Sequence, residues 1–248
     1  MKQSIALVLS ILAFAFTFAQ APNIHRKGYN NNIWVTYNGD HKLSEKWGFH
    51  FDGHLRLSDF VKKGQQLLFR PGVNYHLNNA VSFGMGYAYV YTYQYGVFPA
   101  PSPFPENRLW EQIQLKTQLQ KVEWVSRFRL ENRFVNSPVK TDNQESYEPG
   151  KAVFTNRFRL MNRFSIPMKK NVYLTAMDEL MVNSGKNVGL NVFDQNRLYI
   201  GFGKQLSKTE KLELGYMMQS ILRSDGIRIE KNNTIQLTLI STAKWYKQ

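Results

Sequence analysis

The sequence predicts an all-β protein: an up-and-down antiparallel transmembrane β-barrel of roughly 10–12 strands. Three observations lead to this prediction. The chain starts with a secretory signal, its long segments alternate between apolar and polar side chains, and short turns alternate with long loops. No apolar stretch after the signal is long enough for a membrane helix. A membrane-spanning chain of this kind must form a closed barrel, because only closure satisfies strand backbone groups in lipid.

The first 19 residues have the pattern of a cleavable signal peptide. Lys2 gives a short positive start, and Ile5–Phe18 is a mostly apolar run of 14 residues. This run is short for a spanning helix, which needs about 20 residues. Small residues next to Ala19 predict cleavage after that position. We therefore expect a secretory signal peptide at 1–19 and an outer-membrane β-barrel domain at 20–248.

Composition narrows the class of protein further. A length of 248 residues fits one domain, and the absence of cysteine excludes disulfides, thiolate metal sites and a lipid-anchored cysteine. The net charge of +14 alone would indicate nucleic acid or anionic lipid as partner. For an exported barrel we expect no nucleic acid, and we assign the charge to the lumen, the loops and lipid headgroups. The mean hydropathy of −0.42 does not exclude a membrane barrel, because only its lipid face must be apolar.

The clearest strand runs from Val81 to Tyr95. Its odd positions carry large side chains, five of them tyrosines, and its even positions carry small or polar ones. This period of two predicts a strand, and its length exceeds the roughly 9–11 residues that cross a bilayer. The tyrosines fit an aromatic girdle at the membrane interface. The inward Gly84, Gly86 and Ala88 leave room for long side chains opposite, so we expect a wider charge network or a cavity there.

The same alternation defines the other strands, and eleven are counted from a start near Ile33. Segments that show it are Trp47–Leu57, Gln66–Leu77, Leu109–Leu119, Val122–Phe134, Phe154–Phe164, Val172–Val182, Leu212–Arg223 and Thr234–Tyr246. Bacterial single-chain barrels usually have an even number of strands, so we expect ten or twelve. Asp178 and Glu179 occupy opposite faces of one strand, so one of them must face lipid or lie near an edge. Glu111 also falls on an outward face.

Connections alternate in length, as in outer-membrane barrels. Short turns, assigned to the periplasm, fall near Asn78-Asn79, Lys121-Val122, Pro167–Asn171 and Ser207–Glu210. Long loops, assigned to the outside, are Gly96–Asn107, Asn136–Gly150, Ser184–Asp194 and Ser224–Lys231. Four prolines in the loop 96–107 exclude it from a ladder, and it either enters the lumen or contacts a partner. A soluble β-sandwich, the alternative fold, would have shorter strands and would expose a large arginine-rich face.

The polar face of the strands predicts a charged lumen. The expected inward residues are Arg56, Arg70, Arg108, Arg127, Arg129, Arg133, Arg157, Arg159, Arg163, Arg197, Arg223, Asp52, Glu106, Glu123, Glu131, Glu179 and Glu213. Side chains can fill the narrow lumen of such a barrel, and the planar guanidinium pairs with carboxylates at two points. One interpretation is a structural network that fixes register and closes the pore. The other is an anion-selective pathway or site, because eleven arginines face six acids.

One polar cluster raises the question of enzymatic activity. His50, Asp52 and His54 share a strand face, which is an arrangement compatible with metal binding or acid–base catalysis. Any alternating strand brings such positions together, so geometry favours polar filling of the lumen near the periplasmic end over a metal or catalytic site. The chain has no phosphate-binding loop, zinc-site spacing or nucleophile elbow. We expect no enzyme, cofactor or metal, and the alternative is an envelope lipid-modifying hydrolase with an unrecognised site.

A series of motifs also resembles a known family. In order they are Trp34, Tyr75, Gly86-Tyr87, Glu106-Asn107-Arg108, Gln112, Arg127–Arg133, Asn156–Arg159, Asp178-Glu179, Gln195–Arg197 and Gly215-Tyr216. This series is similar to the domain-of-unknown-function 2490 family of bacterial outer-membrane proteins, and the pair RFRLENR and NRFRL is its most specific part. The chain departs from it at Asn107, where a histidine or arginine is expected. The resemblance implies a barrel without assigned activity, and we expect a monomer in the bacterial outer membrane, with outer-membrane lipid and the barrel-assembly machinery as partners.

Overall fold

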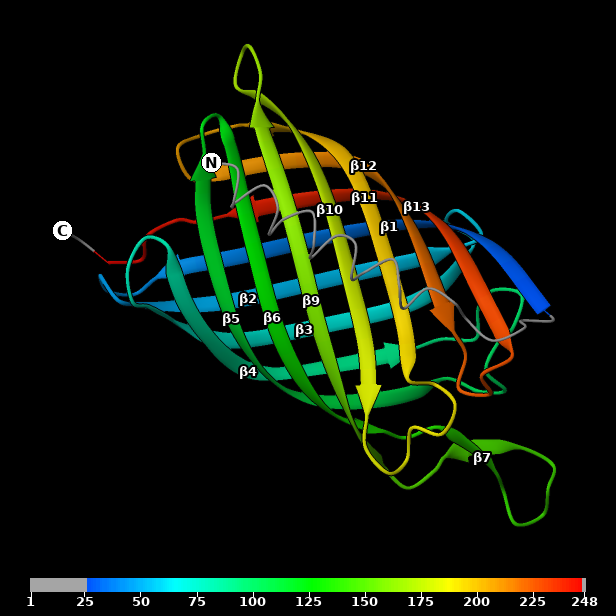
Figure 1. Ribbon diagram of the computed structural model, residues 1–248. Coiled ribbons are helices and arrows are strands. Elements are labelled where there is room, and N and C mark those ends of the chain that lie inside the picture. The colour runs from blue at the N-terminus through cyan, green and yellow to red at the C-terminus, as the bar shows by residue number, and fades with distance from the viewer. Residues whose placement is uncertain (1–25, 247–248) are drawn as a thin grey trace.

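The computed structural model describes residues 26–246, which form one closed barrel and a small separate sheet. The barrel strands are β1 (Arg26–Lys42), β2 (Trp47–Ser58), β3 (Lys63–His76), β4 (Val81–Thr92), β5 (Phe104–Leu119), β6 (Val122–Val135), β9 (Val153–Pro167), β10 (Val172–Ser184), β11 (Phe193–Gln205), β12 (Glu210–Leu222) and β13 (Arg228–Ser241). The short strands β7 (Pro138–Lys140) and β8 (Tyr147–Pro149) form a hairpin that projects from the barrel (Figure 1). No helix in residues 26–246 is long and apolar enough to cross a membrane. The expected signal peptide at 1–19 lies outside the described residues.

Closure of the barrel depends on a parallel pair. Every other pair of neighbouring barrel strands is antiparallel, whereas β1 and β13 run in the same direction from Arg26↔Arg228 to Gly39↔Ser241. An odd number of up-and-down strands leaves the first and last strands parallel. The count of eleven strands is therefore confirmed within the described chain, and the expectation of an even number is wrong.

The two terminal strands also differ from their expected boundaries. β1 starts at Arg26 rather than near Ile33, and β13 occupies Arg228–Ser241 rather than Thr234–Tyr246. Apart from Tyr29 and Ile229, the added residues are glycine or polar residues, so they show no apolar alternation that could reveal them. Asn30 Nδ2 donates to Asn232 Oδ1 at 2.8 Å, and backbone pairing continues here without an apolar face.

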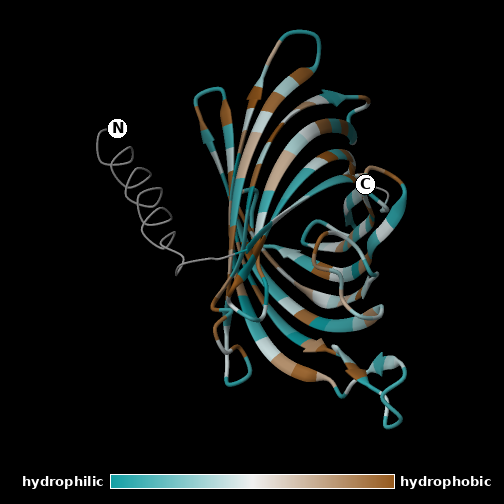
Figure 2. Ribbon diagram, turned by 90° about the vertical axis from the view of Figure 1, so that its right-hand side faces the viewer, coloured by the Kyte–Doolittle hydropathy of each residue, from teal (hydrophilic) through white to brown (hydrophobic). Residues whose placement is uncertain are grey.

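Side chains alternate between the lumen and the outer surface in the predicted phase. On β4, Met85 and Phe83 are exposed on the outer face, while Ala88 and Val90 are fully buried. Figure 2 shows this alternation as teal and brown bands along the strands. In Figure 1, β5, β6, β9 and β10 cross in front of β1–β4 at a steep angle, as expected for tilted strands in a closed barrel.

Two acidic residues do lie on the outer face. Glu179 points into the lumen and is buried, and its neighbour Asp178 points outward, where it accepts a hydrogen bond from Asn196 Nδ2 at 2.6 Å. Glu111 is exposed on the outer face of β5. Both outward positions agree with the alternation. A neutral amide partner partly compensates Asp178 for its apolar surroundings.

Two of the predicted long loops end earlier in the structure than expected. β5 starts at Phe104, so the proline-rich loop ends earlier than the expected 96–107, and Pro105 pairs with Tyr91. Proline is tolerated because its carbonyl oxygen accepts from Asn136 N at 3.2 Å, a contact that needs no proline N–H. The loop after β10 also ends earlier, since Asp194 belongs to β11.

The space beside the inward glycines of β4 is filled. A Cβ on Gly72 would overlap the Trp110 ring, and a Cβ on Gly86 would lie 2.6 Å from Gly72 Cα and 2.8 Å from that ring. Gly84 faces Asn74 and Gln112. An indole, rather than long arginines, therefore occupies the room expected there.

Substituting Gly86 tests this close packing. Gly86→Ala is expected to lower the free energy of unfolding by about 1–3 kcal/mol, because the new methyl group meets backbone atoms that cannot move aside. Gly53→Ala is the control, since its Cβ would come no closer than 3.3 Å to a flexible Phe51 ring. Urea unfolding in lipid vesicles, followed by tryptophan fluorescence, measures both. Equal stability of the two variants would contradict the packing.

Candidate functional site

The lumen holds the whole predicted charge network. The residues Arg70, Arg108, Arg127, Arg129, Glu131, Arg133, Arg157, Arg159, Arg163, Glu179 and Arg197 all lie inside the barrel wall, either buried or lining its cavity. They come from six strands, β3, β5, β6, β9, β10 and β11. Strand alternation places each of them inward, and the register decides which of them meet.

Glu131 is the centre of this network. Its carboxylate is fully buried and accepts hydrogen bonds from Arg157 Nε at 2.9 Å and from Arg159 Nη1 at 2.6 Å. Arg70 and Arg108 approach the same carboxylate at 3.7 Å. Because Arg70 lies on β3 and Arg157 on β9, one carboxylate links strands that are not neighbours in the wall.

Glu179 is a second centre. It accepts from Arg159 Nη2 at 2.6 Å and from Arg127 Nη2 at 2.9 Å, and Arg197 Nη1 lies 3.5 Å away. Arg159 bonds to both Glu131 and Glu179, so it joins the two centres. The paired charges compensate one another in a region where unpaired charges would be costly.

Glu106 binds two arginines at the end of the barrel where the long loops lie. Arg108 donates to its two oxygens at 2.7 and 3.0 Å, and Arg133 donates at 2.5 and 3.1 Å. Both contacts have the two-point geometry expected of guanidinium and carboxylate. Near the other end, Glu213 pairs with Arg163 and accepts from Tyr173 OH at 2.6 Å.

Some members of the network were missed from the sequence. The predicted loop 184–194 includes Asp194, yet this residue is buried and accepts a hydrogen bond from Arg157 Nη1 at 2.8 Å. The pairing of β10 with β11 is irregular between Met181 and Val182, beside Asp194. The strict alternation of inward and outward side chains is interrupted there, so it does not predict the position of Asp194. The predicted loop 224–231 likewise includes Glu230, which is buried with its carboxylate 2.8 Å from Arg223 Nη2.

Two buried arginines have no carboxylate partner among residues 26–246. Arg129 donates through Nε and Nη2 to Gln112 Oε1 at 3.0 and 2.6 Å and lies over the Trp110 ring. Arg56 donates to Gln66 Oε1 at 2.6 Å and stacks on Trp34, 3.9 Å from the ring centroid. Neither arginine forms an ion pair in this part of the chain, so positive charge remains uncompensated in the lumen.

The histidine cluster lies on the lumen face as predicted. His50 Nε2 is 3.3 Å from Asp52 Oδ2, and Arg70 Nη1 is 2.8 Å from the same oxygen. Both ring nitrogens of His54 lack a hydrogen-bond partner in the described structure. No group of three or more His, Cys, Asp or Glu within residues 26–246 is arranged to hold a metal ion. The hydrolase alternative stays a prediction, and Asp52 acts here as a partner of Arg70.

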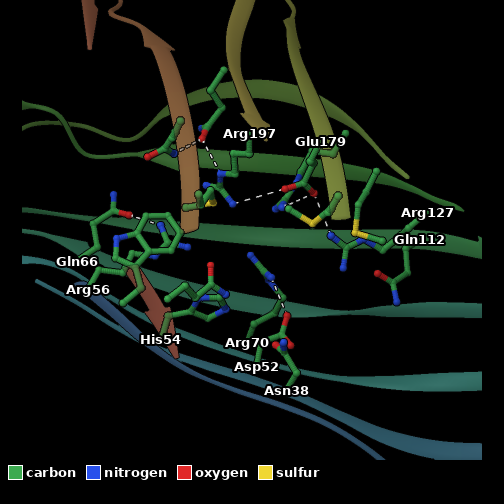
Figure 3. Close-up of a pocket in the computed structure, with 18 of the residues that line it drawn as sticks. Asn38, Asp52, His54, Arg56, Gln66, Arg70, Gln112, Arg127, Glu179 and Arg197 are labelled. Carbon is green, nitrogen blue, oxygen red and sulfur yellow. Dashed lines mark hydrogen bonds and ion pairs between the residues drawn. The ribbon is translucent and has the colours of Figure 1, made fainter. Parts of the chain in front are cut away.

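A cavity of about 610 Å³ runs along the charged lumen. Its lining includes Lys116 and Thr242 beside the short turns, and Ser137 and Ser224 in the long loops. Within residues 26–246, the lining carries twelve Lys or Arg side chains and seven Asp or Glu side chains, an excess of five basic groups. Figure 3 shows arginines and acids projecting into this space from opposite walls.

The proline-rich loop reaches across the end of the barrel. The loop connects β4 to β5 and contacts β1, where Val97 N donates a hydrogen bond to Asn30 Oδ1 at 3.0 Å. Arg223, after β12, donates to the carbonyl oxygen of Phe98. Tyr95 is buried and lines the cavity. Of the two alternatives for this loop, the structure shows the one in which it packs against the lumen.

The closed wall, the apolar outer surface and the charged lumen define a β-barrel of the membrane-spanning type. A family model described as "Protein of unknown function (DUF2490)" matches residues 31–230, and the chain belongs to this family. The resemblance carried by the RFRLENR and NRFRL motifs is thereby confirmed.

Two solved structures align with this chain. The NanC porin aligns with a TM-score of 0.47 and 8% identity, covering 82% of this chain and 94% of the porin chain. The siderophore receptor PirA from Pseudomonas aeruginosa aligns with a TM-score of 0.26 and 11% identity, covering 73% of this chain and 32% of the receptor. No curated protein matches the sequence.

Proposed function

We propose that this protein is an integral outer-membrane β-barrel, monomeric and non-enzymatic, whose lumen is a narrow anion-selective pathway. The observation that carries the proposal is the basic excess along a cavity lined from one barrel end to the other. Rings of arginine can bind or pass anions. The secretory signal pattern and the apolar outer face support insertion into outer-membrane lipid by the barrel-assembly machinery.

The charge network has two roles in this proposal. Carboxylates such as Glu131 and Glu179 hold most arginines in position and narrow the lumen. The uncompensated arginines and lysines set the sign of the electrostatic potential, which raises the local concentration of anions. Side chains that bridge the lumen make the pathway narrow, unlike the wide aqueous channel of large porins.

Reversal potential tests the sign of the permeant ion. Purified protein in a planar bilayer, under a KCl gradient, is expected to conduct and to show a reversal potential displaced toward the chloride equilibrium potential. The physical reason is the excess of five basic groups along the cavity. Heat-denatured protein is the control. A cation-selective current, or no current at all, would refute the proposed anion pathway.

A further inference from the structure

Four side chains meet at one place in the lumen. Trp34 comes from β1, His54 and Arg56 from β2, and Arg197 from β11. Both guanidiniums form cation–π contacts with the Trp34 indole, with Arg56 Cζ 3.9 Å and Arg197 Cζ 5.3 Å from the ring centroid. Figure 3 shows Arg197 projecting from the wall opposite His54 and Arg56, and all four residues line the cavity.

Positive charge at this place lacks a matching carboxylate. Arg56 is only 6% exposed, its Nε has no hydrogen-bond partner, and no acid lies within ion-pair distance in the described chain. Within residues 26–246, Arg197 has one acidic partner, Glu179 at 3.5 Å, and its Nε donates to Gln195 Oε1 at 3.1 Å. The two ring nitrogens of His54 are buried and have no hydrogen-bond partner in the same part of the chain. Water can satisfy the donors, but it cannot neutralise a buried guanidinium, which is costly without a counter-charge.

We propose that His54, Arg56 and Arg197 form a binding site for a small oxyanion, of the carboxylate or phosphate class. This inference rests on the proposed anion pathway and names a binding site within it. A guanidinium presents a planar fork of N–H donors that matches two oxygens of such an anion. The imidazole supplies a further donor, and stacking on Trp34 holds the fork of Arg56 in place.

The neighbouring contacts orient this site. Trp34 Nε1 donates to Gln65 Oε1 at 2.7 Å, which fixes the plane of the indole. Gln66 occupies one Nη of Arg56, so the unpartnered Nε side remains for a ligand. Two arginines from opposite walls would thus hold one anion between them, inside a lumen whose other acids are already paired.

The site can be tested by thermal unfolding of the full chain in detergent. Sodium phosphate, sodium acetate and sodium chloride are compared at equal ionic strength. We expect phosphate, acetate or both to raise the unfolding temperature more than chloride does, because a ligand that binds only the folded state stabilises it. Arg56→Gln is expected to abolish this difference. Lys211→Gln, which removes one positive charge elsewhere in the same cavity, is expected to retain it.

Each outcome decides the proposal. A response to phosphate alone or to acetate alone supports the site and identifies which oxyanion class it prefers. Equal responses to all three salts, or an unchanged response in Arg56→Gln, would overturn it. If Arg56→Gln does not fold, Arg197→Gln, which removes the second guanidinium, provides the same comparison. Protein that binds oxyanions but conducts no current would keep the site and refute only the pathway.

Discussion

Replacing Glu131 with glutamine is expected to lower the free energy of unfolding by about 3–5 kcal/mol. Four arginines surround this fully buried carboxylate, two of them through hydrogen bonds. Glutamine keeps the shape of the side chain but removes its negative charge, so these arginines would repel one another without compensation. Urea unfolding in lipid vesicles and heat-dependent mobility in detergent gels both measure the loss.

Glu123→Gln is the matched control, because it makes the same change on the same strand. Glu123 pairs with Lys116, whose side chain is half exposed at the end of the lumen. An exposed pair of this kind is worth about 0–1 kcal/mol. If Glu131→Gln were as stable as Glu123→Gln, the arginines would not depend on Glu131, and its central role would be refuted.

Shortening the proline-rich loop is expected to raise single-channel conductance several-fold. Residues 94–102 would be replaced by an Asn-Gly turn, which joins adjacent antiparallel strands, and Thr92 and Phe104 are direct partners across β4 and β5. The change removes buried Tyr95 and the segment that Asn30 and Arg223 hold across the barrel end. Conductance rises because access to the lumen is then limited by the charge network alone.

A second loop provides the control for this experiment. The β7–β8 hairpin projects away from the barrel (Figure 1), and Lys140 and Tyr147 are direct partners at its end. Replacing residues 141–146 with the same Asn-Gly turn is expected to leave conductance unchanged. Equal conductance of both variants would show that the proline-rich loop does not restrict the lumen, while a loss of current in the first would mean that it supports the barrel wall.

For the candidate site, the sequence predicts which side chains face the lumen, but not which of them contact one another. Strict alternation identified Arg127, Arg129, Glu131 and Arg133 as inward, because successive side chains of a strand point to opposite sides whatever its neighbours are. Alternation failed at Asp194, beside a register irregularity, because an extra residue changes the face of those that follow. It also failed at Arg26–Asn32, where Tyr29 is the one large side chain with apolar character.

What the sequence alone determined is therefore local: the strand class, the inward face, the arginine excess and the family motifs. These properties follow from periodicity and composition, which need no knowledge of distant residues. The tertiary structure decided the parallel closure of β1 on β13 and the partner of each arginine. It also placed Trp110 over the β4 glycines and left Arg56 without an acid. Those features depend on the register of eleven strands and on distances across the lumen, where residues far apart in the chain meet.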